Sequence, residues 1–458
     1  MRTAALISLA TAVLAWDNKT IDTFYPDIVD PGCVVQTGNS SYSAIPVGSV
    51  GGTPDTEKYG EYNYCFMPHP RDDTYELPSQ KDAQIVALTY VQRHQKRSAY
   101  HTFPEGEDIA YSCSDFLPFL YGGPANRATQ RDPVHVYAST YSDPSVNPFS
   151  TTHDPNTTCQ FPQLTSGGFA DGITHGRDLW AVYGDKLGLL PKYPTPETVW
   201  LRSSTKALTQ QSAGGVLRGL WPYLRDTLPL HQQDEQIDSI GSNYPCDQRD
   251  AYDATWKKSD EFQEHMQVLN PLQTEFKTAF KTNVSDWNSD WDHYNDNFQA
   301  RLCNGYALPP SVNDTAANTV FKAGDWEYNY HYVTQNNATN YVKLKAGVLI
   351  GELVAQLQQV VNGTSSIKYH HVFAHDGDVA PLTASLGIKT LRWPGMGSNI
   401  ALELWKLKNE HFIRVLYSGQ PIRSNLGDLS WIKFDDFVGK WTNSSVPKNI
   451  FDECKVRN

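Results

Sequence analysis

Three short polar clusters in the sequence carry the residue types that phosphate chemistry requires. They are Arg93-His94-Gln95-Lys96-Arg97, Arg202-Ser203-Ser204 and His375-Asp376-Gly377-Asp378. Arginine guanidinium groups bind tetrahedral oxyanions through paired hydrogen bonds, and a neutral histidine can attack phosphorus. A nearby carboxyl group can then protonate the departing oxygen. If the clusters lie together, they form a phosphate site that needs no metal ion, because the arginines neutralise the charge of the phosphoryl group.

Each cluster directly follows an apolar run of strand length. The three runs cover residues 83–92, 198–201 and 367–374. Ligands in open α/β sheets bind beyond the carboxyl ends of the strands, so the clusters converge if these strands are neighbours. Helical spacing follows the second and third clusters, and a helix N-terminus adds backbone N–H donors for an anion. Pairing with surface acids would explain any single arginine or histidine, but it explains three such clusters poorly.

The remaining pattern predicts an α/β sandwich with a mixed central sheet and an inserted, mainly helical cap. Apolar spacing predicts helices at 172–190, 205–220, 341–359 and 378–386, and a closing hairpin at 401–417. The stretch 222–330 is polar and rich in Trp and Tyr, with helical spacing at 253–268 and 271–281. We expect a core domain of 16–104, 165–221 and 331–458, with 105–164 and 222–330 as the cap and insertion.

The N-terminal segment predicts a secretory signal peptide. Arg2 precedes an apolar stretch from Ala4 to Leu14, and small residues stand where signal peptidase cleaves. We therefore expect residues 1–15 to be removed and the mature chain to begin at Trp16. No later stretch reaches the ~18 apolar residues of a membrane span, so no membrane span is expected.

Glycosylation and cysteine patterns agree with secretion. The N-x-S/T acceptors are Asn18, Asn39, Asn156, Asn283, Asn313, Asn337, Asn362 and Asn443. The chain has 7 cysteines, scattered and without a C-x-x-C pair, which favours long-range disulfide bonds over a zinc or redox motif. Because seven is odd, at least one cysteine stays outside an intrachain pair. The sequence thus predicts a secreted glycoprotein carrying N-glycans and disulfide bonds.

The composition argues against a nucleic-acid partner. Lys and Arg number 38 against 50 Asp and Glu, which gives a net charge of −12. Binding of DNA or RNA needs a basic face, for which this composition offers no support.

Other motifs that could carry chemistry are weaker. His370, His371 and His375 are residue types that bind metals, but alternate residues of a strand face opposite sides, and no H-E-x-x-H motif occurs. Asp286 opens a calcium-like pattern that fails because Trp291 stands where the loop needs glycine. G-x-S-x-G and G-x-x-x-x-G-K-[ST] motifs are absent from the sequence. We therefore expect no metal and no cofactor.

At these positions the chain resembles the histidine acid phosphatases, a family that includes fungal phytases. The family signature R-H-G-x-R-x-P matches at Arg93, His94 and Arg97, and its H-D pair matches His375-Asp376 ahead of an apolar helix. Weaker similarities extend over nearly the whole mature chain. Two departures are Gln95 in place of the signature glycine and Ala99 in place of its proline.

The resemblance implies a role for each matched residue. His94 would be the nucleophile and Asp376 the general acid. The phosphate clamps would be Arg93, Arg97, Arg202 and His375. Gln95 and Asp378 stand where they could contact the leaving group.

The acidic balance of the insertion bears on the substrate, because this segment roofs the pocket in the resembling family. Between residues 219 and 327 it carries 18 acidic against 8 basic residues. An acidic roof would repel a polyanion, so we expect a singly phosphorylated ester to be preferred over inositol hexakisphosphate. Acids that point outward and only aid solubility are an equal alternative.

The hypothesis that follows is a secreted acid phosphatase that hydrolyses a phosphate monoester through a phosphohistidine. Two alternatives remain open, the first of them motivated by Gln95 and Ala99. The scaffold could perform non-phosphate acid–base chemistry on a small metabolite, or it could bind a phosphate ligand without turnover.

Overall fold

The computed structural model describes residues 63–116, 136–139, 141, 143, 145–148, 157–225, 227–388 and 391–456. The expected signal peptide, the acceptors Asn18, Asn39 and Asn156, and Cys33 lie outside these residues.

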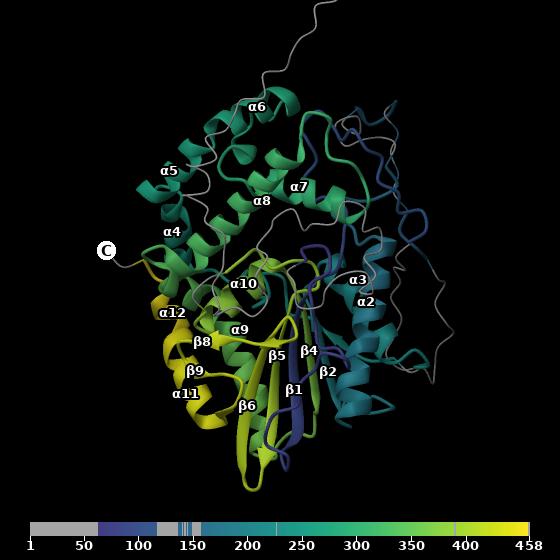
Figure 1. The fold of residues 1–458 in the computed structure, drawn as a ribbon, viewed down its shortest axis with the longest axis vertical. Coiled ribbons are helices and arrows are strands. Elements are labelled where there is room, and N and C mark those ends of the chain that lie inside the picture. Colours follow the sequence, from purple (N-terminus) through teal and green to yellow (C-terminus); the bar gives the residue numbers. More distant parts are fainter. Residues whose placement is uncertain are drawn as a thin grey trace, which may run out of the picture.

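A central mixed sheet organises the described part of the chain (Figure 1). Its strands are β1 (Gln84–Arg93), β2 (Val199–Ser203), β3 (Leu230–His231), β4 (Tyr369–Ala374), β5 (Asn399–Leu407), β6 (Glu410–Tyr417), β7 (Gln420–Pro421) and β10 (Ile432–Lys433). The order is β10-β6-β5-β1-β4-β2-β3, with β7 beside β6. Strands β1, β4, β2 and β3 run parallel, while β5 and β6 are antiparallel. A small separate ribbon pairs β8 (Arg423–Ser424) with β9 (Gly427–Asp428).

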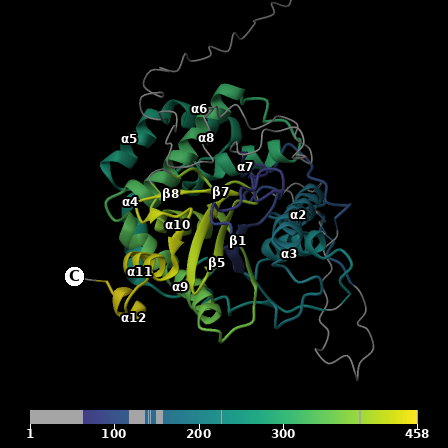
Figure 2. The ribbon, with the colours of Figure 1, turned by 60° about the horizontal axis from the view of Figure 1, so that its bottom comes forward.

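Helices cover both faces of the sheet (Figure 2). One face packs against α2 (Ser166–Leu179), its π-helical continuation (Trp180–Lys186) and α3 (Ala207–Leu220). The other packs against α9 (Ala338–Val361), α10 (Asp376–Ser385) and α11 (Phe434–Ser445), and α12 (Ile450–Glu453) follows near the C-terminus. These layers confirm the predicted α/β fold with a mixed central sheet.

The burial of both sheet faces explains the strand sequences. Along β4, Tyr369 and Phe373 join the core under α2 and α3, whereas Val372 and Ala374 join the core under α9 and α10. Successive side chains of a strand point to opposite faces, so a strand covered on both sides becomes a continuous buried run. Every residue of β4 is buried accordingly.

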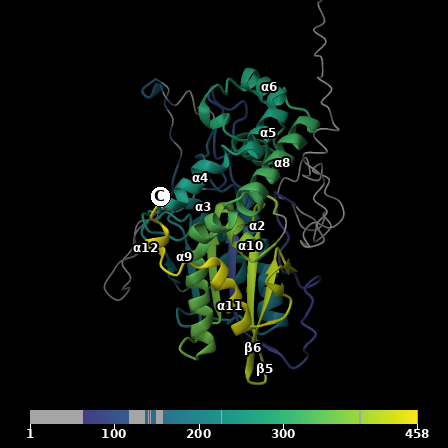
Figure 3. The same ribbon diagram turned by 90° about the vertical axis from the view of Figure 1, so that its left-hand side faces the viewer.

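A helical layer lies over the carboxyl ends of β1, β4 and β2 (Figures 1 and 3). It contains α4 (Asp247–Trp256), α5 (Asp260–Val268), α6 (Asn270–Phe280), a 3-10 turn (Ser285–Trp287), α7 (Asp292–Cys303), α8 (Asp314–Asn329) and a π-helical turn (Tyr330–Thr334). Its aromatic core includes Trp291, Tyr294 and Phe298, and this core extends to Tyr64 and Trp393 beside the sheet. The helical layer is therefore packed onto the sheet end. The domain bounds given above remain a prediction.

Three disulfide bonds join distant segments. They are Cys65–Cys303, Cys113–Cys159 and Cys246–Cys454, with sequence separations of 238, 46 and 208 residues. The expectation of long-range disulfides is confirmed. Among the described helices, none is both long and apolar enough to cross a membrane.

Candidate active site

The ends of three neighbouring parallel strands bring the polar clusters together. Arg93 and Ala374 face each other at the end of the β1–β4 pair, and Ser203 lies opposite Phe373 in the β2–β4 pair. A cavity of about 520 Å³ opens beyond these ends. Its lining includes His94, Arg97, Ser204, Lys345, His375 and Asp376. The parallel strands β1 and β4 therefore bring the first and third clusters to the same end of the sheet, as the sequence predicts.

His94 is fixed in one tautomer at the floor of the cavity. Its Nδ1 lies 2.9 Å from the carbonyl oxygen of Gln95, so Nδ1 carries the proton and Nε2 keeps its lone pair. Burial lowers the pKa of His94 well below its usual value, and the charges of Arg93, Arg97 and His375 lower it further. The imidazole is thus neutral, with Nε2 unprotonated.

Asp376 opens helix α10 beside His94. One carboxylate oxygen accepts hydrogen bonds from Trp393 Nε1 at 2.7 Å and lies 2.8 Å from Arg93, and the other accepts from the Gly377 N–H. Burial alone would raise the pKa of this carboxyl group, but Arg93, His94 and Trp393 together hold it below its ordinary value. The free site therefore holds Asp376 as a carboxylate.

The two arginines of the first cluster are buried differently. Arg97 lines the cavity and pairs with Asp296 of α7 through two hydrogen bonds of 2.6 and 3.3 Å. Arg93 lies behind Asp376 and donates to Tyr64 Oη and the Pro394 carbonyl. Among the described residues, the buried Nε atoms of both arginines have no hydrogen-bond partner. Both guanidinium groups thus retain a donor.

His375 lies beside His94 in the cavity lining. Its Nε2 lies 3.1 Å from Ser204 Oγ, and its ring centroid is 5.6 Å from that of His94. Asp378 also lines the cavity, but its two oxygens accept from the backbone N–H groups of Gly241 and His375. Asp378 thereby caps α10 and holds the wall at Gly241.

Gln95 lies outside the cavity, contrary to its expected place near the leaving group. Its side chain is fully buried, with Nε2 3.4 Å from His175 Nδ1 and Oε1 packed against Gly397. Ala99 is fully buried as well. The side chain of Gln95 therefore points into the protein, because the loop at Gly397 leaves room for it there.

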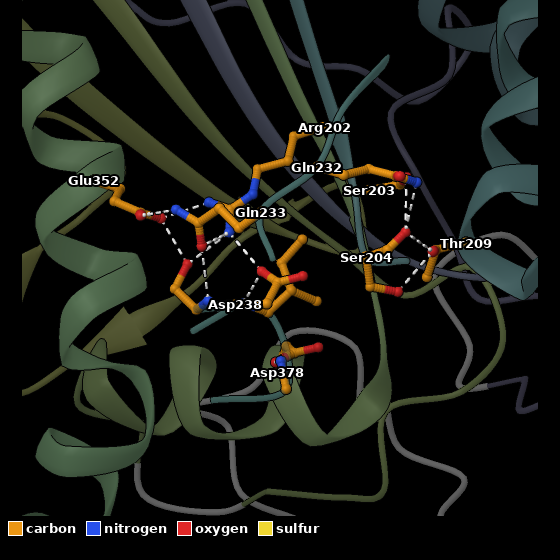
Figure 4. Close-up of polar contacts among 12 residues, drawn as sticks. Arg202, Ser203, Ser204, Thr209, Gln232, Gln233, Asp238, Glu352 and Asp378 are labelled. Atoms are coloured by element: carbon orange, nitrogen blue, oxygen red, sulfur yellow. Dashed lines mark hydrogen bonds and ion pairs between the residues drawn. The ribbon is translucent and has the colours of Figure 1, made fainter. Parts of the chain in front are cut away.

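Arg202 is held by partners that are not part of the cavity lining (Figure 4). It forms ion pairs with Asp238 and with Glu352 of α9, and it donates to Gln233 and Ser239. Successive side chains of β2 point to opposite faces of the sheet. Leu201 joins the core under α2 and α3, so the side chain of Arg202 lies on the other face, which α9 covers. The structure does not bring Arg202 to the phosphate cluster.

Two residues of this region were not predicted from the sequence. Lys345 reaches the cavity from α9, 251 positions beyond His94 by residue number, and Trp393 contacts Asp376 from the loop before β5. Neither belongs to a motif. A lysine between the apolar residues Leu344 and Ala346 of a helical pattern was a weak signal for Lys345.

The acids of the insertion do not face the cavity in the described part of the chain. Its lining contains two carboxyl groups, Asp376 and Asp378, and both belong to α10. Several acids of the insertion have partners elsewhere, as Asp290 does with Lys257 and Asp325 with Arg392. The structural basis for an acidic roof is therefore missing. The outward-facing alternative does not hold for every acid, because Asp238, Asp290, Asp296, Asp325 and Glu327 are buried.

Comparisons with known proteins agree with this architecture. The model of the histidine phosphatase superfamily (branch 2) matches residues 84–418. Counting factor 60 of Dictyostelium discoideum is 28% identical over 308 residues, which cover 65% of this chain and 72% of that protein. 2-Phosphoxylose phosphatase 1 of Homo sapiens is 22% identical over 435 residues, which cover 91% of this chain and 87% of that protein.

Solved structures share the fold. The phytase from D. castellii superposes with a TM-score of 0.52 at 14% identity, covering 92% of this chain and 93% of that one. The Bifidobacterium longum multiple inositol polyphosphate phosphatase, in complex with inositol hexasulfate, gives a TM-score of 0.54 at 11% identity, covering 85% and 99%. Since the family model spans most of the sheet and the helices around it, the chain belongs to the histidine phosphatase superfamily (branch 2), the histidine acid phosphatases, which are hydrolases of phosphate monoesters.

Proposed function

We propose that this chain is a secreted acid phosphatase that uses His94 as nucleophile and Asp376 as proton donor. The observation that carries the proposal is the tautomer of His94. Because Gln95 O binds Nδ1, the lone pair of Nε2 is available at the end of the cavity where the other polar groups gather. A neutral, positioned imidazole is the nucleophile that a phosphohistidine requires.

The reaction proceeds in two balanced steps. His94 Nε2 bonds to phosphorus while the ester P–O bond breaks, and Asp376 gives a proton to the departing oxygen. Water then attacks the phosphohistidine, loses a proton to Asp376 and releases phosphate, which restores the free imidazole. Asp376 is ionised in the free site, so its first proton must arrive with the substrate. A monoester phosphate keeps one proton below about pH 6, which favours acidic conditions.

Arg97 and His375 support binding of the phosphoryl group. Both line the cavity together with His94. The unpartnered Nε donor of Arg97 supplies a charge-assisted hydrogen bond to a phosphoryl oxygen, while Arg93 adds its positive charge from behind Asp376. Arg202 has no part in this clamp, because Asp238 and Glu352 hold its guanidinium.

The proposal of secretion draws on two features. Three disulfide bonds suit an oxidising compartment. The side chains at the described acceptors Asn283, Asn313, Asn362 and Asn443 are exposed, and Asn337 is partly exposed. Glycan attachment is therefore sterically open at these positions.

No observation favours the two alternative functions over hydrolysis. Gln95 and Ala99 motivated the first alternative, and neither of these residues is part of the cavity lining.

The test is to trap the phosphoenzyme. Wild-type protein quenched during turnover of a labelled aryl phosphate should carry acid-labile, alkali-stable label, and His94→Ala should carry none and lose nearly all activity. His101→Ala is the matched control, because His101 stacks on His293 and is not part of the cavity lining. Label on the His94→Ala protein, or activity within tenfold of wild type, would overturn the assignment.

A further inference from the structure

The cations of the cavity differ in whether an acid already neutralises them. Arg97 pairs with Asp296, and Lys206 pairs with Glu235. Lys345 also lines the cavity, yet within the described chain no carboxylate forms an ion pair with it. Its Nζ donates to the carbonyl oxygen of Gly241 at 3.1 Å. An ammonium group has three donors, so Lys345 keeps capacity for another acceptor.

The surroundings of Lys345 make its charge available to a ligand. The residue lies on α9 between buried Leu344 and buried Ala346, and its own side chain is only partly exposed. Burial lowers the pKa of the lysine, and Asp378 opposes that effect. An anion that contacts Nζ would compensate this desolvation better than water alone.

Lys345 lies in the part of the cavity that Gly241 and Asp378 form. His94 and Arg97 line the same cavity from the segment that follows β1. Gly241 joins Lys345 and Asp378, because its N–H donates to Asp378 at 2.6 Å and its carbonyl accepts from Lys345. When the phosphoryl group of a substrate lies at His94, Lys345 is therefore placed to contact the alcohol part of that substrate.

The wall next to Lys345 is held in place by several contacts. Asp238 is bound by Arg202 and accepts from the N–H of Ile240, and Asp378 anchors Gly241 (Figure 4). Gly241 has a φ of +78°, a conformation that suits glycine. The lysine thus faces a preformed surface, and little ordering is needed when a ligand binds.

We propose that Lys345 forms a second anion subsite, which selects phosphate monoesters whose alcohol carries another acidic group such as a carboxylate. This subsite deepens the proposed function and rests on it, since the alcohol is defined by cleavage at His94. The absence of insertion acids from the described cavity lining removes the repulsion that would oppose such a substrate.

The test compares two esters that differ in one group. In 2-phosphoglycerate a carboxylate replaces one hydroxymethyl group of glycerol 2-phosphate. Wild type should show a kcat/KM at least tenfold higher for 2-phosphoglycerate. Lys345→Met should remove that preference and change kcat/KM for glycerol 2-phosphate less than threefold, and Lys345→Arg should retain most of it. Equal losses on both esters would show a merely structural role and overturn the proposal.

A matched control and a binding measurement separate the possible failures. Lys343→Met removes a charge from the same helix, but Lys343 pairs with Glu453 away from the cavity, so the preference should persist. Calorimetry on His94→Ala measures binding of both esters without turnover. If wild type hydrolyses neither ester but 2-phosphoglycerate still binds tenfold tighter through Lys345, the proposed function fails and the subsite stands. Equal dissociation constants would remove the subsite whatever the activity.

Discussion

The side-chain oxygen of Gln95 occupies the space that a β-carbon would need at Gly397. A Cβ built on Gly397 would lie 2.6 Å from Gln95 Oε1, and the glycine has a φ of +73°. The same glycine donates its N–H to the His94 carbonyl at 3.0 Å. Because Gly397 has no side chain, the side chain of Gln95 can point away from the cavity. The backbone carbonyl of Gln95 meanwhile fixes the tautomer of His94.

Gly397→Ala should therefore destabilise the protein and disturb His94. Positive φ costs a non-glycine residue roughly 1–2 kcal/mol, and the contact with Gln95 adds to this. Thermal unfolding and kcat, measured together, should both fall. Gly439→Ala is the control, because Gly439 lies in α11 with no heavy atom near a built Cβ, and it should leave the protein slightly more stable. Equal melting temperatures for the two variants would contradict the role of Gly397.

The placement of Arg202 leads to a second prediction. Arg202→Met leaves Asp238 and Glu352 without their partner, and breaking a buried pair typically costs about 3–5 kcal/mol. Chemical denaturation should show this loss, while KM for an aryl phosphate stays within about threefold for the folded protein. Lys433→Met breaks an exposed pair with Glu410 and should cause no measurable change. A tenfold rise in KM at unchanged stability would instead restore Arg202 as a phosphate clamp.

The strand ends show what the sequence alone could predict. Apolar runs that end in polar clusters located β1, β2 and β4, and their parallel order brought His94 and Asp376 together as expected. The prediction that Arg202 lines the phosphate site was wrong because it placed Arg202 beyond the end of the strand. The strand extends to Ser203, so side-chain alternation, and not the strand end, decides where Arg202 points.

Lys345 and Trp393 were not predictable for a different reason. Each reaches the site through tertiary packing of a segment that carries no local motif, one from α9 and one from the loop before β5. Gln95 illustrates the same limit, because the space that accepts its side chain is created by Gly397, 302 positions further along by residue number.

A third prediction separates the two chemical roles. Asp376→Asn removes the proton donor but keeps the shape of the side chain. Loss of a general acid typically costs 10²- to 10⁴-fold, roughly, for a poor leaving group, whereas a nitrophenolate leaves without a proton. The ratio of kcat/KM for 4-nitrophenyl phosphate to that for glycerol 2-phosphate should therefore rise by at least tenfold. An unchanged ratio would mean that Asp376 only organises the loop with Trp393 and Arg93.

The last prediction concerns pH and follows from the hydrogen bond between Trp393 and Asp376. Because the pKa of His94 is lowered, the nucleophile stays neutral as pH falls through 6.5, and activity should persist in moderately acidic solution. The alkaline limb of kcat instead reports loss of the proton from Asp376 in the substrate complex. Trp393 donates to the ionised carboxylate and so lowers its pKa. Trp393→Phe should raise that pKa and shift the alkaline limb to higher pH.

Trp441→Phe provides the control for this shift. Trp441 donates from Nε1 to Ser385 Oγ at 2.9 Å in the core, and it is not part of the cavity lining. Its substitution removes a comparable buried hydrogen bond, so it can lower stability, but it leaves the charges around Asp376 unchanged. The pH profile of kcat should then coincide with that of wild type. A limb that moves equally in both tryptophan variants, or moves to lower pH in Trp393→Phe, would show that the carboxylate of Asp376 does not control this ionisation.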